Sequence, residues 1–140
     1  MLTINRQTDY ASRIILHLAI QGDGSRVTTA EIAERRLIPK AFVRRVVTQL
    51  AAAGLIATTR GAEGGIVLAR PAGEISLLEV VEAMEGPLAL NACTVNPHTC
   101  PLVAACPVNK AWCRARDLLV AELRGVTFDK LATEGVKRGA

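Results

Sequence analysis

The sequence predicts a mainly α-helical fold with a small β-hairpin wing, arranged as a winged helix-turn-helix that is followed by a long helix. Half of the 140 residues are apolar and only 3% are aromatic, so Ala, Val, Leu and Ile must build the core, which favours closely packed helices. Three segments of helical periodicity precede a glycine-containing β-prone run, and this is the order of elements in a winged helix-turn-helix.

Two helices are expected in the N-terminal part. Apolar residues recur at helical spacing from Thr8 to Ile20, which predicts the first helix. The segment QGDGSR ends it, and Thr28 followed three residues later by Glu31 has the form of a capping box. A short second helix is therefore expected from this cap to about Arg36.

A third helix is expected from Pro39 to Ala53, with Gly54 as its C-cap. Its apolar residues fall on one side, and the other side carries hydrogen-bond donors, namely Lys40, Arg44, Arg45, Thr48 and Gln49. A helix in the major groove must present such donors to base edges and phosphates, so we predict that these five residues contact DNA. Each of them taken singly also fits a solvated surface position, and only their combination with the hairpin favours DNA binding.

The run LIATTRGAEGGIVLAR, which Pro71 ends, predicts a β-hairpin that would serve as the wing. Arg60 stands at the start of its turn, where the glycines that follow permit a close approach of the backbone to a minor groove or phosphate. Residues 35–70 hold seven Lys and Arg residues and one acid, whereas the whole chain has a net charge of +4. Because the positive charge is concentrated here, we expect residues 1–88 to form a winged helix-turn-helix DNA-binding domain.

After the wing, the C-terminal part is expected to form two further helices that a loop connects. Ser76 and Glu79 form another capping box, which predicts a fourth helix to Met84. Residues 89–106 then form a loop, and a long helix follows from about Pro107 to Arg124 with an apolar stripe of Val108, Trp112, Ala115, Leu119 and Leu123. A stripe outside the compact head needs a partner, so residues 107–140 are expected to be a dimerisation helix with a C-terminal tail, and the protein a homodimer.

Three cysteines lie in this loop and one lies in the long helix, at Cys93, Cys100, Cys106 and Cys113. The N-terminus lacks the apolar run of a signal peptide, and no segment approaches the roughly 20 apolar residues that span a bilayer, so we expect a cytoplasmic protein without a membrane segment. In a reducing cytosol, clustered cysteines are more often metal ligands or redox thiols than disulfides. No CxxC is present, which weakens zinc-ribbon and thioredoxin-type interpretations, and the wide gaps suit the thiolate ligands of an iron-sulfur cluster.

Cys113 is expected to stand apart from the three loop cysteines. If both Cys106 and Cys113 lie on the long helix, about 10 Å along its axis separates them, too far for one small cluster. A packed thiol beside Trp112 is therefore favoured over a redox or ligand role. Three thiolates leave one coordination position to fill.

The chain resembles a known family along nearly its whole length. The opening TINRQTDYASR, the wing RGAEGGIVLARP, the segment ISLLEVVEAMEGPL and the cysteine loop are similar to the IscR, NsrR and RirA group of winged-helix regulators, the Rrf2 family. The resemblance implies a homodimeric regulator that binds a palindromic operator in double-stranded DNA. It also implies one iron-sulfur cluster per subunit, with a 4Fe-4S cluster favoured over a 2Fe-2S cluster, whose response to nitric oxide, redox state or iron controls DNA affinity.

The fourth ligand differs between branches of this group. The IscR branch has a His three residues after the last loop cysteine, where this chain has Asn109. The NsrR branch uses an Asp of the first helix, donated from the other subunit, and the TDYA segment places Asp9 at that position. CPLVAACPVNKA also resembles the RirA iron sensors. The resemblance thus favours Asp9, with His98, water or a small thiol as alternatives; Asp9 in turn suits a helix N-terminus for purely structural reasons.

Two rival functions remain at this point. One is a winged-helix regulator that senses through cysteine thiol oxidation or zinc without an iron-sulfur cluster. The other is a cysteine enzyme, but the chain has no glycine-rich phosphate loop, no HExxH and no cysteine with an evident base, so we expect no enzymatic activity.

Overall fold

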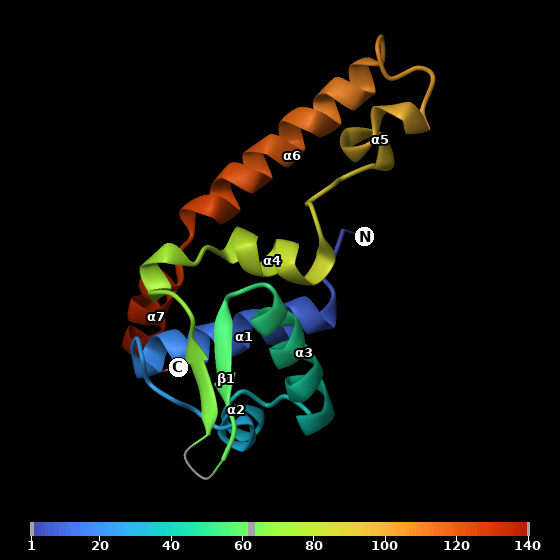
Figure 1. Ribbon diagram of the computed structural model, residues 1–140. Coiled ribbons are helices and arrows are strands. Elements are labelled where there is room, and N and C mark those ends of the chain that lie inside the picture. The colour runs from blue at the N-terminus through green and yellow to red at the C-terminus, as the bar shows by residue number, and fades with distance from the viewer. Residues whose placement is uncertain (1, 62–63, 140) are drawn as a thin grey trace.

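The computed structural model describes residues 2–61 and 64–139, which form a helical head from which one long helix projects (Figure 1). The elements follow in the order α1 (Arg6–Gln21), α2 (Thr29–Arg35), α3 (Lys40–Ala52), β1 (Ile56–Thr59), β2 (Gly65–Leu68), η1 (Ala72–Glu74), α4 (Leu77–Glu85), α5 (Ala92–Val95), η2 (Pro97–Thr99), α6 (Pro107–Gly125) and α7 (Phe128–Lys137). The expected mainly α-helical fold with a β-hairpin wing is confirmed.

The first helix begins two residues earlier than predicted, because Asn5 caps it. The Asn5 side-chain oxygen accepts a hydrogen bond from the Thr8 amide at 2.9 Å, which leaves Thr8 fully buried inside the helix. Only half of the predicted capping box is formed at α2: Thr28 Oγ1 accepts from the Glu31 amide at 3.1 Å, but the Glu31 carboxylate does not return to the Thr28 amide. The Glu31 carboxylate turns toward α1, where it lies 3.5 Å from Nε2 of His17.

A tight turn joins α2 to α3 and fixes their relative orientation. Leu37 in this turn has a φ of 54°, in the left-handed region that non-glycine residues rarely adopt, and its side chain is 82% exposed. The next residue anchors the turn, because Ile38 is buried and its amide donates to the Ala33 carbonyl at 3.0 Å. At the other end of α3, Gly54 has a φ of 75° and the Leu55 amide donates to the Leu50 carbonyl at 3.1 Å, as expected of a glycine-terminated helix.

The wing is an antiparallel hairpin in which Ile56 pairs with Leu68 and Thr59 with Gly65. Ile56, Ile66 and Leu68 are buried against the head, so hydrophobic contact fixes the register of the hairpin. Residues just before α2 also hold it, because the amides and carbonyls of Val27 and Ile66 exchange two hydrogen bonds of 2.9 and 2.8 Å. The base of the wing is thereby attached to the helix-turn-helix.

The first helix lies at the centre of the head and contacts α3, α4 and α7 (Figure 1). Its residues Ala11, Ile14, Ile15 and Leu18 are completely buried, and Phe128 at the start of α7 is 1% exposed. The chain thus returns after α6 to pack its last helix on its first. Backbone hydrogen bonds from Leu77 to Val126 and from Phe128 to Ile75 secure this return.

The fourth helix carries the reciprocal capping box that the sequence predicted. Ser76 Oγ accepts from the Glu79 amide, and the Glu79 carboxylate accepts from the Ser76 amide at 3.0 Å. Glu79 is also paired with Arg70 at 2.6 Å, which ties the end of the wing to α4. From α4 the chain runs through the cysteine segment, defined here as residues 91–106, into α6. No helix among the described residues is long and apolar enough to cross a bilayer.

A buried histidine joins α1 to both ends of α2. His17 is 1% exposed, and its Nδ1 accepts a hydrogen bond from Arg36 Nε at 2.9 Å, while Nε2 faces Glu31 without hydrogen-bond alignment. Burial lowers the pKa of His17 below its usual 6.5, and the Arg36 guanidinium lowers that pKa further, against a smaller opposing effect of Glu31. The folded protein therefore favours the neutral imidazole.

We expect this histidine to make the free energy of unfolding depend on pH. The pKa of His17 is lower in the folded protein than the unfolded value of 6.5, so the unfolded chain binds the proton first as the pH falls. The contribution of His17 to the free energy of unfolding is therefore fully present above pH 6.5 and is lost as the pH drops toward the folded pKa. Urea unfolding of the wild type and of His17→Gln between pH 5 and 7.5 measures this slope. His17→Gln should flatten it, whereas His98→Gln, at an exposed position, should not; equal slopes for all three proteins would contradict the assignment.

Candidate DNA-reading surface and cysteine site

The exposed face of α3 carries all five donors that the sequence proposed for DNA. Lys40, Arg44, Arg45, Thr48 and Gln49 are exposed, whereas the opposite side of the helix buries Val43, Val46, Val47 and Leu50 in the core. The apolar side of α3 therefore orients the helix, and the basic side faces solvent. This arrangement is suitable for insertion into a major groove about as wide as one helix.

The donors on α3 differ in how firmly they are held. The Arg45 guanidinium lies 5.5 Å from the centre of the Phe42 ring, which in turn contacts the Tyr10 ring edge-on. The side chains of Lys40 and Arg44 make no hydrogen bond or ion pair within residues 2–61 and 64–139. Arg45 is thus preoriented by a cation–π contact, while the other two are free to reach a phosphate or a base.

The wing adds a second polar surface beside α3. Arg60 is exposed at the end of β1. A cleft between the wing and the start of α2 is lined by four threonines, Thr28, Thr29, Thr58 and Thr59, and by Val47 of α3. The sequence analysis predicted Arg60 but missed these hydroxyls, which only the two adjacent threonine pairs in the sequence could have indicated. Their proximity depends on the long-range pairing of Val27 with Ile66.

The three loop cysteines lie on three different short elements near the start of α6. Cys93 is in α5, Cys100 ends η2, and Cys106 is the N-cap of α6. All are half-buried free thiols, as is Cys113 in the second turn of α6.

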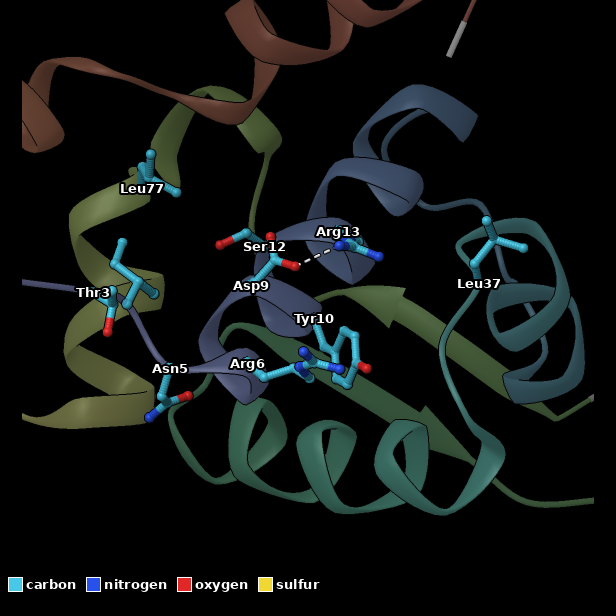
Figure 2. Close-up of a pocket in the computed structure, with 10 residues that line it drawn as sticks. Thr3, Asn5, Arg6, Asp9, Tyr10, Ser12, Arg13, Leu37 and Leu77 are labelled. Atoms are coloured by element: carbon cyan, nitrogen blue, oxygen red, sulfur yellow. Dashed lines mark hydrogen bonds and ion pairs between the residues drawn. The ribbon is translucent and has the colours of Figure 1, made fainter. Parts of the chain in front are cut away.

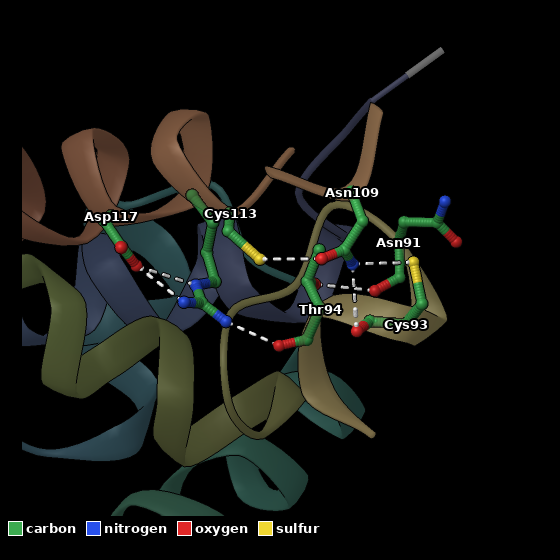
Figure 3. A network of polar contacts seen from close by, with 7 residues as sticks. Asn91, Cys93, Thr94, Asn109, Cys113 and Asp117 are labelled. Atoms are coloured by element: carbon green, nitrogen blue, oxygen red, sulfur yellow. Dashed lines mark hydrogen bonds and ion pairs between the residues drawn. The ribbon is translucent and has the colours of Figure 1, made fainter. Parts of the chain in front are cut away.

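Asn109 contacts two of the loop cysteines, Cys93 and Cys106, and Figure 3 shows its contact with Cys93. Its side-chain Nδ2 donates to the Cys93 carbonyl at 3.3 Å and approaches Cys93 Sγ at 3.1 Å, while its backbone amide donates to Cys106 Sγ at 3.4 Å. On the other side, Cys113 Sγ lies 3.8 Å from Asn109 Oδ1. One turn further along α6, Arg116 donates to the Thr94 carbonyl at 2.6 Å, so two side chains of α6 hold α5.

The structure does not bring the whole predicted ligand set together within one chain. Within the described part of the chain, no three His, Cys, Asp or Glu side chains are grouped closely enough to hold a metal ion. Cys93 and Cys106 share the contacts of Asn109, whereas Cys100 and the exposed His98 take no part in them. The donor chemistry nevertheless fits an iron-sulfur cluster, because such clusters take thiolate ligands and the thiols here are free.

Asp9 lies on the surface of α1 (Figure 2), facing a hollow that no described cysteine lines. Its carboxylate pairs with Arg13 at 2.6 Å, and the side chain is 51% exposed. Both residues line an open hollow of about 980 Å³ with Leu37 and Leu77 at its edges. Asp9 therefore faces a concave, solvent-accessible surface.

The long helix α6 has no fully buried residue among its 19. Asn109, Cys113 and Arg116 lie on the side toward α5. Another side leaves apolar groups in solvent, with Val108 59%, Trp112 39% and Leu119 39% exposed. Leu123, which the sequence placed in the same stripe, is half-buried.

Comparison with known proteins identifies relatives that cover most of the chain. The Rrf2 family model, an iron-dependent transcriptional regulator, matches residues 4–134. The protein aau3 of Rhizobium meliloti (strain 1021) is 36% identical over 132 residues, which cover 93% of this chain and 84% of that protein. The protein rrf2 of Nitratidesulfovibrio vulgaris is 29% identical over 130 residues, covering 93% and 87%.

Solved structures of similar fold include two kinds of regulator. CymR, the global cysteine regulator of B. subtilis, superposes with a TM-score of 0.80 at 26% identity over 96% of this chain and 98% of its own. T. potens IscR superposes with a TM-score of 0.75 at 24% identity over 95% and 88%, which shows a shared fold. The matched family model describes a transcriptional regulator, and the solved CymR structure is likewise described as that of a regulator. With a family model that spans residues 4–134 and a winged helix-turn-helix of the same architecture, this chain belongs to the Rrf2 family of transcriptional regulators.

Proposed function

We propose that this regulator is a homodimer that binds a palindromic operator through α3 and the wing, and that an iron-sulfur cluster on Cys93, Cys100 and Cys106 controls its DNA affinity. The observation that carries the proposal is the position of the cysteine segment. It is held on the first turns of a helix whose free apolar side suits dimerisation. When bound, the cluster would supply an electron-accepting and oxidant-sensitive centre at this point.

The exposed apolar side of α6 supports a homodimer. Val108, Trp112 and Leu119 leave a contiguous apolar surface that a monomer would hold in water at a free-energy cost. A second copy of the same helix across a twofold axis buries it with an identical surface. Two heads related in this way would read two half-sites of a palindrome.

The connections of α6 support linkage between the cysteine site and DNA. Asn109 and Arg116 join the start of α6 to the cysteine segment, while the far end of α6 leads through Val126 into hydrogen bonds with the core of the head. A change in the cysteine segment would therefore alter how α6 sits on the head and how far apart the two α3 helices lie. Linkage requires that the cluster and the DNA each bind one arrangement of α6 more tightly than another.

Asp9 is our preferred fourth ligand, donated from the second subunit. Its single exposed ion pair with Arg13 is worth at most about 1 kcal/mol, so ligation would readily replace it. Its place in an open hollow would let another subunit approach. His98, water or a small thiol remain the alternatives for that position.

A sensor that works by thiol oxidation is the second candidate. It is favoured by the four free thiols and by the likeness to CymR, whose described role is that of a cysteine regulator. Such a protein, or a zinc form, would be colourless, whereas an iron-sulfur protein absorbs visible light through its thiolate-iron bonds.

The cluster is tested on protein purified without oxygen. We expect visible absorption and a native mass corresponding to a dimer with one cluster per subunit. Cys100→Ser should lose iron and sulfide because a ligand is removed, and Asp9→Ala should change the spectrum while the circular dichroism stays the same. Cys113→Ser is the matched control and should keep the wild-type iron content; iron-free, colourless wild type would refute the cluster and favour thiol sensing.

The DNA-reading surface is tested by Arg44→Ala, measured by binding titrations on operator and scrambled DNA at several salt concentrations. If Arg44 contacts a base, the loss should be about 1–3 kcal/mol and should reduce discrimination; if it contacts a phosphate, binding should weaken on both DNAs and the salt slope should fall by about one. Lys137→Ala, at an exposed position on α7, removes the same charge and should leave operator binding within twofold, roughly the effect of a distant surface charge. Unchanged binding by Arg44→Ala would place the interface elsewhere.

The dimer surface is tested by Leu119→Glu, which would bury a carboxylate in the apolar seam. We expect a monomer in sedimentation equilibrium and a large loss of operator affinity, with the helical content retained. Ala121→Glu introduces the same group at an exposed position two residues further along α6 and should remain dimeric. A dimeric Leu119→Glu protein would exclude this side of α6 as the seam.

A further inference from the structure

Asn109 is the residue around which the cysteine site is organised. It is half-buried in the first turns of α6, and its atoms contact three cysteines from three places in the sequence. The backbone amide donates to Cys106 Sγ, Nδ2 donates to Cys93, and Oδ1 accepts from the Cys113 thiol. Among the described residues, no other side chain forms hydrogen bonds to more than one of the four thiols, and nearby Arg116 donates to the Thr94 carbonyl.

The two contacts of the amide depend on its orientation. Nδ2 can donate to the carbonyl and sulfur of Cys93 only if Oδ1 points the other way along α6, toward Cys113. An amide rotated by half a turn would set Oδ1 against the Cys93 carbonyl and leave both acceptors unpaired. The thiol of Cys113 is a weak donor, and it stabilises the productive orientation by donating to Oδ1.

We infer that Asn109 is the positioning residue of the cysteine site. Asn109 holds Cys93 beside Cys106 at the start of α6, and Cys113 fixes the orientation of the Asn109 side-chain amide. Cys113 then acts through Asn109 and does not ligate metal. The inference deepens the proposed function, on which its cluster measurement rests, but the placement of the two thiols is a property of the metal-free chain as well.

The metal-free placement is tested by disulfide formation in the full-length protein. In a Cys100→Ser, Cys113→Ser background only Cys93 and Cys106 remain, and the hydroxyl at position 113 still can donate to Oδ1. Diamide takes one hydrogen from each of the two thiols, becomes a hydrazine, and leaves one Sγ–Sγ bond. The rate is followed by the loss of free thiols, and the product is identified by mass spectrometry after digestion with pepsin.

Adding Asn109→Ala or Asn109→Asp to this background should slow the reaction roughly fivefold, the factor that one net hydrogen bond of about 1 kcal/mol corresponds to. Both variants lack the donor to Cys93, but only Asn109→Asp carries a charge and keeps the oxygen that faces Cys113. Equal slowing therefore assigns the effect to the lost donor. Lys110→Ala, at the exposed neighbouring position, should react at the rate of the background.

The role of Cys113 is tested by exchanging its serine replacement for Cys113→Ala in the same background. The alanine variant loses the donor to Oδ1, so the amide is free to rotate and the rate should fall toward that of Asn109→Ala. Because serine preserves the donor and alanine does not, a purely space-filling thiol would give equal rates. Equal rates for both would overturn the assignment to Cys113, and an Asn109→Ala rate equal to the background would overturn the whole inference.

A second measurement uses protein in which the cluster has been reconstituted without oxygen. Removal of an N–H donor from a ligand sulfur should shift the midpoint potential of the cluster to more negative values in Asn109→Ala, while Lys110→Ala should keep the wild-type potential. A wild type that takes up no cluster would refute the proposed function and leave the disulfide rates to decide on Asn109. If the wild-type cluster forms, but Asn109→Ala changes neither its midpoint potential nor the rate of disulfide formation, this inference alone is refuted.

Discussion

The burial of α1 is the constraint on which the rest of the structure depends. Four of its apolar side chains, Ala11, Ile14, Ile15 and Leu18, are removed completely from water, at roughly 25 cal/mol for each Å² of apolar surface. These side chains belong to a helix that packs against α3, α4 and α7, which come from different parts of the chain. Because the apolar side of α3 must meet this helix, its basic side has to face solvent, and the position of the proposed DNA-reading surface follows from core packing.

The same packing gives the cysteine segment a connection to that surface. Helix α6 leaves the head and has no fully buried residue, yet both its ends are fixed. Asn109 and Arg116 hold α5 at its start, and at its end the Val126 carbonyl and the Phe128 amide bond to residues around α4. In the proposed homodimer, a helix that is fixed at both ends and apolar on one free side would be suited to transmit a change at the thiols to the two heads.

Local signals in the sequence were sufficient for most of the secondary structure. Capping residues such as Thr28 and Ser76, the glycine that ends α3 and the periodic apolar residues act within one or two turns, so their effect needs no knowledge of distant contacts. The start of α1 was predicted two residues late because apolar periodicity does not mark a helix N-terminus, whereas Asn5 caps the helix and packing buries Thr8 inside it. The wing was predictable because its glycines and β-prone runs are adjacent in sequence.

The sequence by itself determined the fold class, the basic side of α3 and the residue types at the cysteine site, because each depends on composition or on spacing within one element. Only the tertiary structure decided which of those residues meet. In the sequence, Asn109 is only a departure from a histidine pattern, whereas the packing of α5 against α6 places it between Cys93, Cys106 and Cys113. The same fold leaves Cys100 outside these contacts and puts Asp9 on another surface. Such meetings depend on long-range packing, whose free energy is a sum over many distant contacts that no local pattern encodes.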